Sequence, residues 1–213
     1  MKDKPVEQVT PYPDSLEAIF KALGIPATYA STCGMPMQQE CITLVNTELD
    51  VFGRQPRLEA RTFAAWTAMK VAAARAGIEL QLVSAFRSIA YQKELIERKL
   101  ARGDSINTIL AVNAAPGFSE HHTGRALDIG CPGYAHLEIE FEQSPAYVWL
   151  TSHAQAFGFH LSFPLGNSYG VQYEPWHWCY RGNEAAKKQY GGAGEKRGGT
   201  AKKMEYSSTL IRG

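Results

Sequence analysis

Residues 119–128, Ser119-Glu-His121-His-Thr-Gly124-Arg-Ala126-Leu-Asp128, decide how the rest of the chain is interpreted. A second stretch further along, Glu174-Pro-Trp-His177, supplies another histidine and a free carboxylate. Two histidines and an aspartate can close three corners of a tetrahedron around zinc, and a nearby carboxylate can act at the fourth. The two stretches together predict a zinc site formed by His121, Asp128 and His177.

The second half of the first stretch has the pattern of a strand. Side chains alternate between the two faces of a strand, so Asp128 shares one face with Gly124 and Ala126, whereas Leu127 and Ile129 take the other. The first face leaves room for a metal and a substrate, and the second suits a hydrophobic core. Small residues on a strand also suit a tight packing contact, so the pattern alone leaves both interpretations open.

The second stretch places His177 between two aromatic residues. Trp176 and Trp178 share the opposite strand face and can be buried, which leaves His177 pointing into the site. Glu174 precedes His177 across Pro175 and is near enough to enter the same pocket without ligating. The alternative for Glu174 is a surface carboxylate at the start of a strand. The other histidines (His122, His136, His153 and His160) are predicted to be structural.

The composition is that of a globular domain. The chain has 213 residues, of which 45% are apolar, with 22 basic and 21 acidic side chains. Such a charge balance gives no reason to expect nucleic acid or an acidic membrane as a partner. No apolar run approaches the roughly 20 residues of a membrane-spanning helix, and the N-terminus lacks the apolar core of a secretory signal. The compartment is therefore left open by the sequence.

The four cysteines do not form a CxxC pair, which argues against a structural zinc knuckle. Cys33 and Cys41 lie close in the sequence and could form a disulfide in an oxidising compartment; four reduced thiols are the alternative. Cys131 and Cys179 are predicted not to bond. If Asp128 and His177 are abreast on antiparallel strands, these cysteines lie roughly 17 Å apart.

Hydrophobic periodicity predicts alternating helices and strands in one domain. Helices are expected over 16–23, 58–76, 90–100, 105–112 and 146–157, and strands over 41–45, 78–83, 125–130, 159–163 and 172–180. Residues 1–13 are predicted to be a loose lead-in and 14–183 a single zinc peptidase domain. Residues 184–213 are rich in Gly and Lys and carry a net charge of +4, so we expect a mobile tail.

The two metal-ligand stretches resemble those of the VanY-type zinc D-alanyl-D-alanine carboxypeptidases, in the group that includes VanX-type dipeptidases and the Hedgehog signalling domain. Three further segments carry the resemblance: Ser84-Ala-Phe-Arg87-Ser88 with Tyr91-Gln92, Ala146-Tyr-Val-Trp-Leu with Phe157-Gly-Phe, and Tyr173 to Tyr180. It covers roughly residues 40–182. It implies an α+β fold in which a small central antiparallel sheet carries the zinc site and is flanked by helices.

The resemblance also implies residue roles. It places Zn²⁺ on His121, Asp128 and His177, with Glu174 as general base and acid. Arg87 would steady the oxyanion, as a fixed guanidinium can, although an ordinary salt bridge is the alternative. Ser119 and Gln92 match positions that hydrogen-bond the substrate's terminal carboxylate.

The chain departs from the family at two positions beside the site. Ser162 and Cys179 stand where family members often have a basic residue and an arginine, respectively. These departures leave the register of the substrate and the preference for its penultimate residue open. They do not touch the predicted metal ligands.

The expected function is a monomeric zinc metallocarboxypeptidase that removes the terminal D-alanine from peptidoglycan stem peptides, through a D,D or an L,D bond. The alternatives are a D,D-dipeptidase, a peptidoglycan endopeptidase and a zinc-containing binding module without catalysis. A periplasmic or cell-envelope location follows from this substrate alone.

Overall fold

The computed structural model describes residues 15–182, and the predicted lead-in and tail lie outside this range. The helices of seven or more residues occur where the sequence predicts helices, and shorter helical turns lie between them. The helices are α1 (Leu16–Leu23), α2 (Tyr29–Thr32), α3 (Ala60–Arg75), α4 (Ile89–Ala101), α5 (Ile106–Val112) and α6 (Pro145–His153), and the 3-10 turns are η1 (Glu120–Thr123), η2 (Ile139–Gln143) and η3 (Ala154–Phe157). No helix in this part of the chain is long and apolar enough to cross a membrane.

A four-stranded antiparallel sheet forms the centre of the fold, as predicted. Its strands are β3 (Gln81–Ser84), β4 (Ala126–Gly130), β5 (Phe159–Leu161) and β6 (His177–Tyr180), in the order β3-β4-β6-β5. A separate hairpin pairs β1 (Leu44–Asn46) with β2 (Arg57–Glu59). Asp128 on β4 is directly opposite Ser84 on β3 and His177 on β6, which confirms the predicted register between Asp128 and His177.

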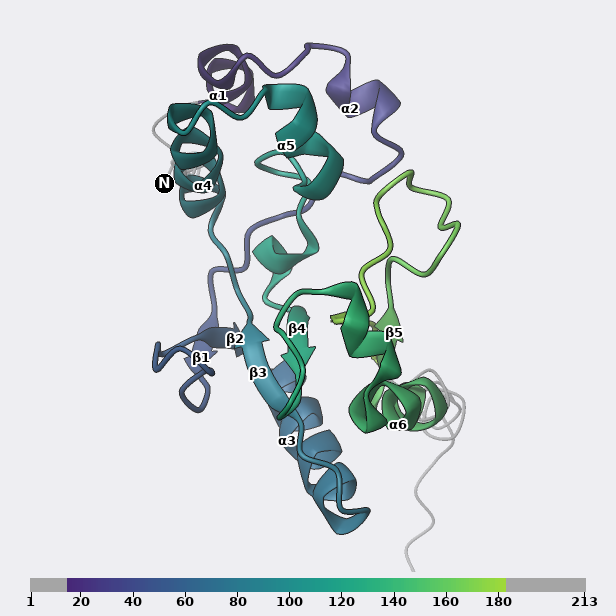
Figure 1. Cartoon of the computed structure of the whole chain (residues 1–213). Coiled ribbons are helices and arrows are strands. Elements are labelled where there is room, and N and C mark those ends of the chain that lie inside the picture. The colour runs from purple at the N-terminus through teal and green to yellow at the C-terminus, as the bar shows by residue number, and fades with distance from the viewer. Residues whose placement is uncertain (1–14, 183–213) are drawn as a thin grey trace, which may run out of the picture. The chain divides into compact units, whose positions relative to one another are not determined.

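Two hydrophobic clusters support the sheet and the helices. The larger one packs Leu127, Ile129 and Trp178 of the sheet against α3 and α6. The smaller one joins α1, α4 and α5, which are grouped together in Figure 1. Tyr29 connects this group to the chain before η1, because its hydroxyl accepts a hydrogen bond from the Ala115 amide at 3.1 Å.

Several predicted elements have different bounds in the structure. The strands predicted over 41–45 and 78–83 begin later, at Leu44 and Gln81, and the helix predicted over 146–157 is divided into α6 and η3. The helix predicted over 58–76 begins at Ala60, because residues 57–59 pair with β1 instead and Glu59 caps the helix by accepting from the Thr62 amide at 3.1 Å. The strand predicted over 172–180 was too long. Only His177–Tyr180 joins the sheet, since Pro175 has no N–H and the His177 amide turns back to the Glu174 carbonyl.

All four cysteines are free thiols. Cys131 and Cys179 are buried, whereas Cys33 and Cys41 are partly exposed in the segment before β1. Cys33 and Cys41 are not joined to each other in the structure.

Candidate metal centre

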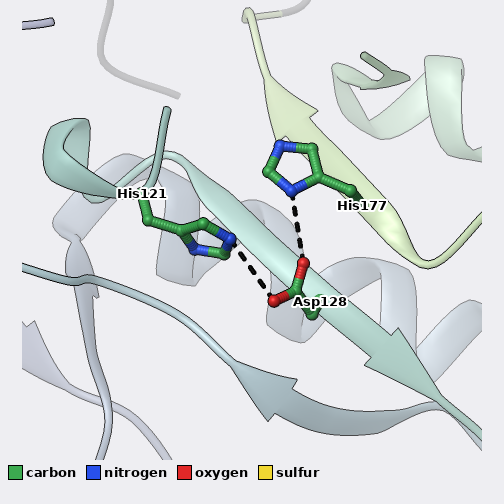
Figure 2. A group of neighbouring side chains, drawn as sticks. All are labelled: His121, Asp128 and His177. Carbon is green, nitrogen blue, oxygen red and sulfur yellow. Dashed lines mark hydrogen bonds and ion pairs between the residues drawn. The ribbon is translucent and has the colours of Figure 1, made fainter. Parts of the chain in front are cut away.

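His121, Asp128 and His177, hereafter the triad, come together although they lie on three different elements (Figure 2). His121 lies on η1, Asp128 in the middle of β4 and His177 at the start of β6. His121 Nε2 is 3.3 Å from Asp128 Oδ2, and His177 Nδ1 is 3.2 Å from Asp128 Oδ1. All three side chains are buried. The structure thus brings together the three residues that the sequence singled out as ligands.

The turn before β4 explains how His121 reaches Asp128. Ser119 begins η1 by accepting a hydrogen bond from the His121 amide at 3.4 Å, and Gly124 ends it with φ of +64°. A Cβ on Gly124 would lie 2.8 Å from Leu44 Cδ2 and 3.0 Å from the Glu59 amide. Only glycine satisfies both the left-handed backbone and this close approach.

The spacing of the triad atoms fits a tetrahedral zinc ion. With bonds of about 2.1 Å, such an ion holds neighbouring ligand atoms about 3.4 Å apart. The two His–Asp separations, 3.3 Å to Oδ2 and 3.2 Å to Oδ1 of Asp128, are each close to that value, and one ligand atom from each residue lies within 4.8 Å of the others. Two imidazoles and one carboxylate are also a donor set that zinc accepts in catalytic sites.

Each histidine is oriented by a second partner on its far nitrogen. His121 Nδ1 donates to the Ala85 carbonyl at 2.7 Å, which directs Nε2 toward Asp128. His177 Nε2 donates to Glu120 Oε2 at 2.9 Å, which directs Nδ1 toward Asp128. Partners of this kind fix the tautomer and ring orientation of metal-binding histidines.

The charges of the triad are strongly coupled. Burial lowers the pKa of His121 to about 4, helped by the nearby Arg87 cation. Burial also opposes ionisation of Asp128, but the charge and hydrogen bonding of the two histidines outweigh it and hold the pKa of Asp128 well below its usual range. For His177, the hydrogen bonds to Asp128 and Glu120 outweigh burial and raise the pKa to about 10.

Glu174 lies beside the triad, as predicted. Its Oε2 atom is 3.8 Å from His177 Nδ1, and its side chain is 18% exposed. Burial is the main reason that the pKa of Glu174 rises to about 7, against the attraction of the His177 charge. A carboxyl group of this kind can accept and release a proton near neutral pH.

Arg87 follows β3 and contacts the triad. Its Nη2 atom is 3.6 Å from Asp128 Oδ2, and its Nη1 donates to Gln92 Oε1 at 3.2 Å. The Arg87 carbonyl accepts from His122 Nδ1 at 2.6 Å, which gives His122 the structural role predicted for it. Within residues 15–182, Arg87 Nε is buried and has no hydrogen-bond partner. The guanidinium is thus held against Asp128 through Nη2 and against Gln92 through Nη1.

A cleft of about 990 Å³ opens over these residues. It is lined by the triad, Arg87 and Glu174, and by the loop between β1 and β2, by α4, and by the end of α5. Ser119 and Gln92 also line it. Both ends of the Gln92 amide have protein partners, since its Nε2 donates to the Ala114 carbonyl at 2.8 Å; contact of either residue with a substrate stays a prediction.

Glu120 is the site residue that sequence reasoning missed. It lies between two residues of the predicted motif, and its side chain lines the cleft. Burial opposes its ionisation, but the hydrogen bond and charge of His177 lower the pKa of Glu120 to about 2. The sequence offers one signal, a carboxylate adjacent to a ligand, but pairing with His177 depends on the fold.

The two departures from the family pattern lie around Glu120. A hydrogen bond from Ser162 helps to hold the Glu120 pKa down. Burial, helped by the charge of Glu120, raises the pKa of Cys179 to about 12. Both residues are buried, and neither is among the residues found to line the cleft. Their direct influence is thus on Glu120.

Solved structures of peptidoglycan peptidases have a similar fold. The LdcB LD-carboxypeptidase has a TM-score of 0.63 and 28% identity, covering 72% of this chain and 74% of that one. VanYB in complex with D-alanine-D-alanine has a TM-score of 0.56 and 29% identity, covering 72% and 84%. A further VanY variant, solved with Zn(II), has a TM-score of 0.55, 29% identity and coverage of 72% and 86%.

Relatives in sequence give the same family. YodJ of Bacillus subtilis is 31% identical over 182 residues, or 82% of this chain and 66% of its own length. The D-alanyl-D-alanine carboxypeptidase of Enterococcus faecalis is 34% identical over 129 residues, 55% of this chain and 46% of its own length. The chain thus spans about two thirds and about half of these relatives. Residues 55–183 match the VanY family model, described as D-alanyl-D-alanine carboxypeptidase, and the chain belongs to that family.

Proposed function

We propose that the protein is a zinc metallocarboxypeptidase that removes the C-terminal D-alanine from peptidoglycan stem peptides. The observation that carries the proposal is the buried triad with Glu174 and Arg87 in one cleft. The complexes of the VanY relatives with D-alanine-D-alanine and with Zn(II) support the choice of substrate and metal.

The triad residues would hold the zinc ion, through His121 Nε2, an Asp128 carboxylate oxygen and His177 Nδ1. When bound, zinc lowers the pKa of a coordinated water and polarises a carbonyl group. The protein contributes a buried site whose histidines are already turned toward one point by Ala85 and Glu120. Little reorganisation is then needed when the metal binds.

Glu174 is assigned as the proton carrier. It lines the cleft within 3.8 Å of a ligand atom, so it can take a proton from the attacking water and deliver it to the leaving amine. The same carboxyl group serves both steps, because the amine departs from the carbon that the water attacked.

Arg87 is assigned as the cation that faces the developing oxyanion. Its guanidinium is anchored by Gln92 and Asp128, and the residue lines the cleft. An arginine retains its proton throughout the reaction, so it stabilises negative charge without exchanging protons. A binding module without catalysis has no use for this cation or for Glu174, which makes that alternative the weaker one.

The bond that is cleaved distinguishes the closely related alternatives. LdcB is described as an LD-carboxypeptidase, whereas the E. faecalis relative is described as a D-alanyl-D-alanine carboxypeptidase. VanXYC of Enterococcus gallinarum, 31% identical over 109 residues (49% of this chain and 57% of its own), is named as both dipeptidase and carboxypeptidase. The cleft is lined from the β1–β2 loop to α5, which also leaves room for an endopeptidase substrate.

Mass spectrometry of muropeptides tests the proposal and selects among these bonds. Pentapeptide, tetrapeptide and cross-linked dimer would each be incubated with zinc-loaded protein, with and without a chelator. We expect chelator-sensitive loss of one alanine from the pentapeptide or the tetrapeptide. Release of a dipeptide or cleavage of the dimer would replace the carboxypeptidase with one of the alternatives, and no cleavage of any substrate would contradict an enzymatic role.

A further inference from the structure

Glu120 contacts the triad from outside it. Its Oε2 atom accepts from His177 Nε2 at 2.9 Å, and its side chain is only 17% exposed. We propose that Glu120 is a positioning residue for the metal centre, which holds the His177 ring so that Nδ1 faces the ion. This inference rests on the proposed metal centre and assigns Glu120 no contact with the reacting atoms.

The two nitrogens of an imidazole lie on different sides of the ring, so a partner on one nitrogen determines where the other points. With Nε2–H donated to Glu120, Nδ1 faces Asp128 at 3.2 Å and Glu174 at 3.8 Å. Turning the ring over would break the bond to Glu120 and move Nδ1 away from Asp128. Ring packing on Phe163, with centroids 4.7 Å apart, restricts its tilt but does not distinguish one nitrogen from the other.

The two histidines differ in the nature of their partner. His121 is held by a main-chain carbonyl, that of Ala85, which survives any substitution. His177 is held by the Glu120 side chain, so a single substitution can remove the contact that orients the ring. The asymmetry makes the proposal testable at Glu120 and leaves His121 as an internal reference.

Arg181 in turn supports Glu120. Its Nη2 atom is 3.8 Å from Glu120 Oε1 and donates to Ser162 Oγ at 3.5 Å, while its own amide is tied to the Gly158 carbonyl. Oε2 of the carboxylate thus contacts His177 and Oε1 lies near Arg181, while Ser162 also hydrogen-bonds Glu120. The Arg181 side chain is 48% exposed, so solvent screens this pair and its contribution is small.

Zinc affinity measured by competition with a chromogenic chelator at neutral pH tests the inference without any substrate. We expect Glu120→Ala to weaken binding about 10–100-fold, as loss of such partners does elsewhere. Glu120→Gln keeps an oxygen that accepts from Nε2–H and should fall between Glu120→Ala and the wild type. Arg181→Ala should change the affinity by about fivefold or less. Glu94→Ala removes an exposed carboxylate on α4 and serves as the charge control, with no change expected.

Two further readouts separate positioning from folding. Apo-protein melting curves show whether each variant is folded, and NMR of the zinc-loaded protein identifies the nitrogen of His177 that carries the proton. We expect proton on Nε2 in the wild type and in Glu120→Gln, with a mixed state in Glu120→Ala. Wild-type zinc affinity in folded Glu120→Ala, or weaker binding by Glu120→Gln than by Glu120→Ala, would overturn the inference. Failure of the wild type itself to bind zinc would overturn the proposed metal centre instead.

Discussion

The two faces of β4 carry opposite kinds of buried residues. One face presents Asp128 to two histidines and Arg87, and the other packs Leu127 and Ile129 into the larger hydrophobic cluster. Burying a charged cluster is weak support for stability, because desolvation offsets much of its internal attraction. Burying aliphatic side chains is the dominant favourable term. Alternation along one short strand therefore separates the chemistry of this protein from its stability.

Replacing Glu174 on the polar side should have the largest effect and should leave the fold intact. We expect Glu174→Gln to lower kcat about 10²–10⁴-fold, because the amide cannot carry the proton. Zinc content and melting temperature should remain those of the wild type. Turnover of the muropeptide identified above, together with metal analysis, provides the measurement.

Glu97→Gln is the matched control for Glu174, since it makes the same change on an exposed side chain of α4. Full activity in Glu174→Gln with zinc retained would remove the assigned role. Loss of zinc in that variant would show that the polar face cannot be altered one residue at a time.

Truncating Leu127 should give the reverse pattern. Leu127 is fully buried, so we expect Leu127→Ala to lower the free energy of unfolding by about 2–5 kcal/mol. Activity per folded molecule and zinc stoichiometry should not change. Urea denaturation measures the loss, and Val148→Ala on the exposed side of α6 should change stability by no more than about 0.5 kcal/mol. A stable Leu127→Ala protein that has lost zinc would contradict the separation of the two faces.

The smallest expected effect concerns a polar anchor of the apolar side. Glu48 Oε1 accepts from the indole of buried Trp66 and from Lys70, each at 2.8 Å. Burial opposes the ionisation of Glu48, but the hydrogen bonds from Lys70 and Trp66 and the charge of Lys70 outweigh burial and lower the pKa of Glu48. A lowered pKa stabilises the fold above the unfolded-state value of 4.5, and this contribution is lost as the pH falls toward the folded-state value.

Glu48→Gln should therefore reduce stability by about 1 kcal/mol at neutral pH, with the difference shrinking in acid. Urea midpoints at neutral and acidic pH provide the measurement, and Glu79→Gln, on an exposed side chain, is the control. A stability difference between Glu48→Gln and the wild type that grows in acid would contradict a lowered pKa for Glu48.

The sequence was sufficient for the parts of the site that depend on local periodicity. Alternation in 125–130 placed Asp128 on the strand face opposite the core. Gly124, which was predicted to share that face, instead ends η1 before the strand begins. The resemblance to the family then identified Arg87 and Glu174 as site residues, and both line the same cleft in the structure.

What the sequence did not predict depends on contacts between distant segments. The sequence predicts a helix from residue 58, because the pairing of residues 57–59 with β1 depends on a contact outside the local pattern. The pairing of Glu120 with His177 follows from the meeting of η1 and β6, and the link from Arg181 follows from the end of β6. Intrinsic secondary-structure propensity carries no information on contacts between distant segments.

Asp128 and His177 occupy directly opposed positions on neighbouring strands. Their separation is therefore set by the spacing of the sheet and not by the length of chain that joins them. Insertions or deletions between β4 and β6 can change the rim of the cleft while the two ligands keep their distance. A search for such centres in other proteins should require the strand register and leave the gap between the motifs unconstrained.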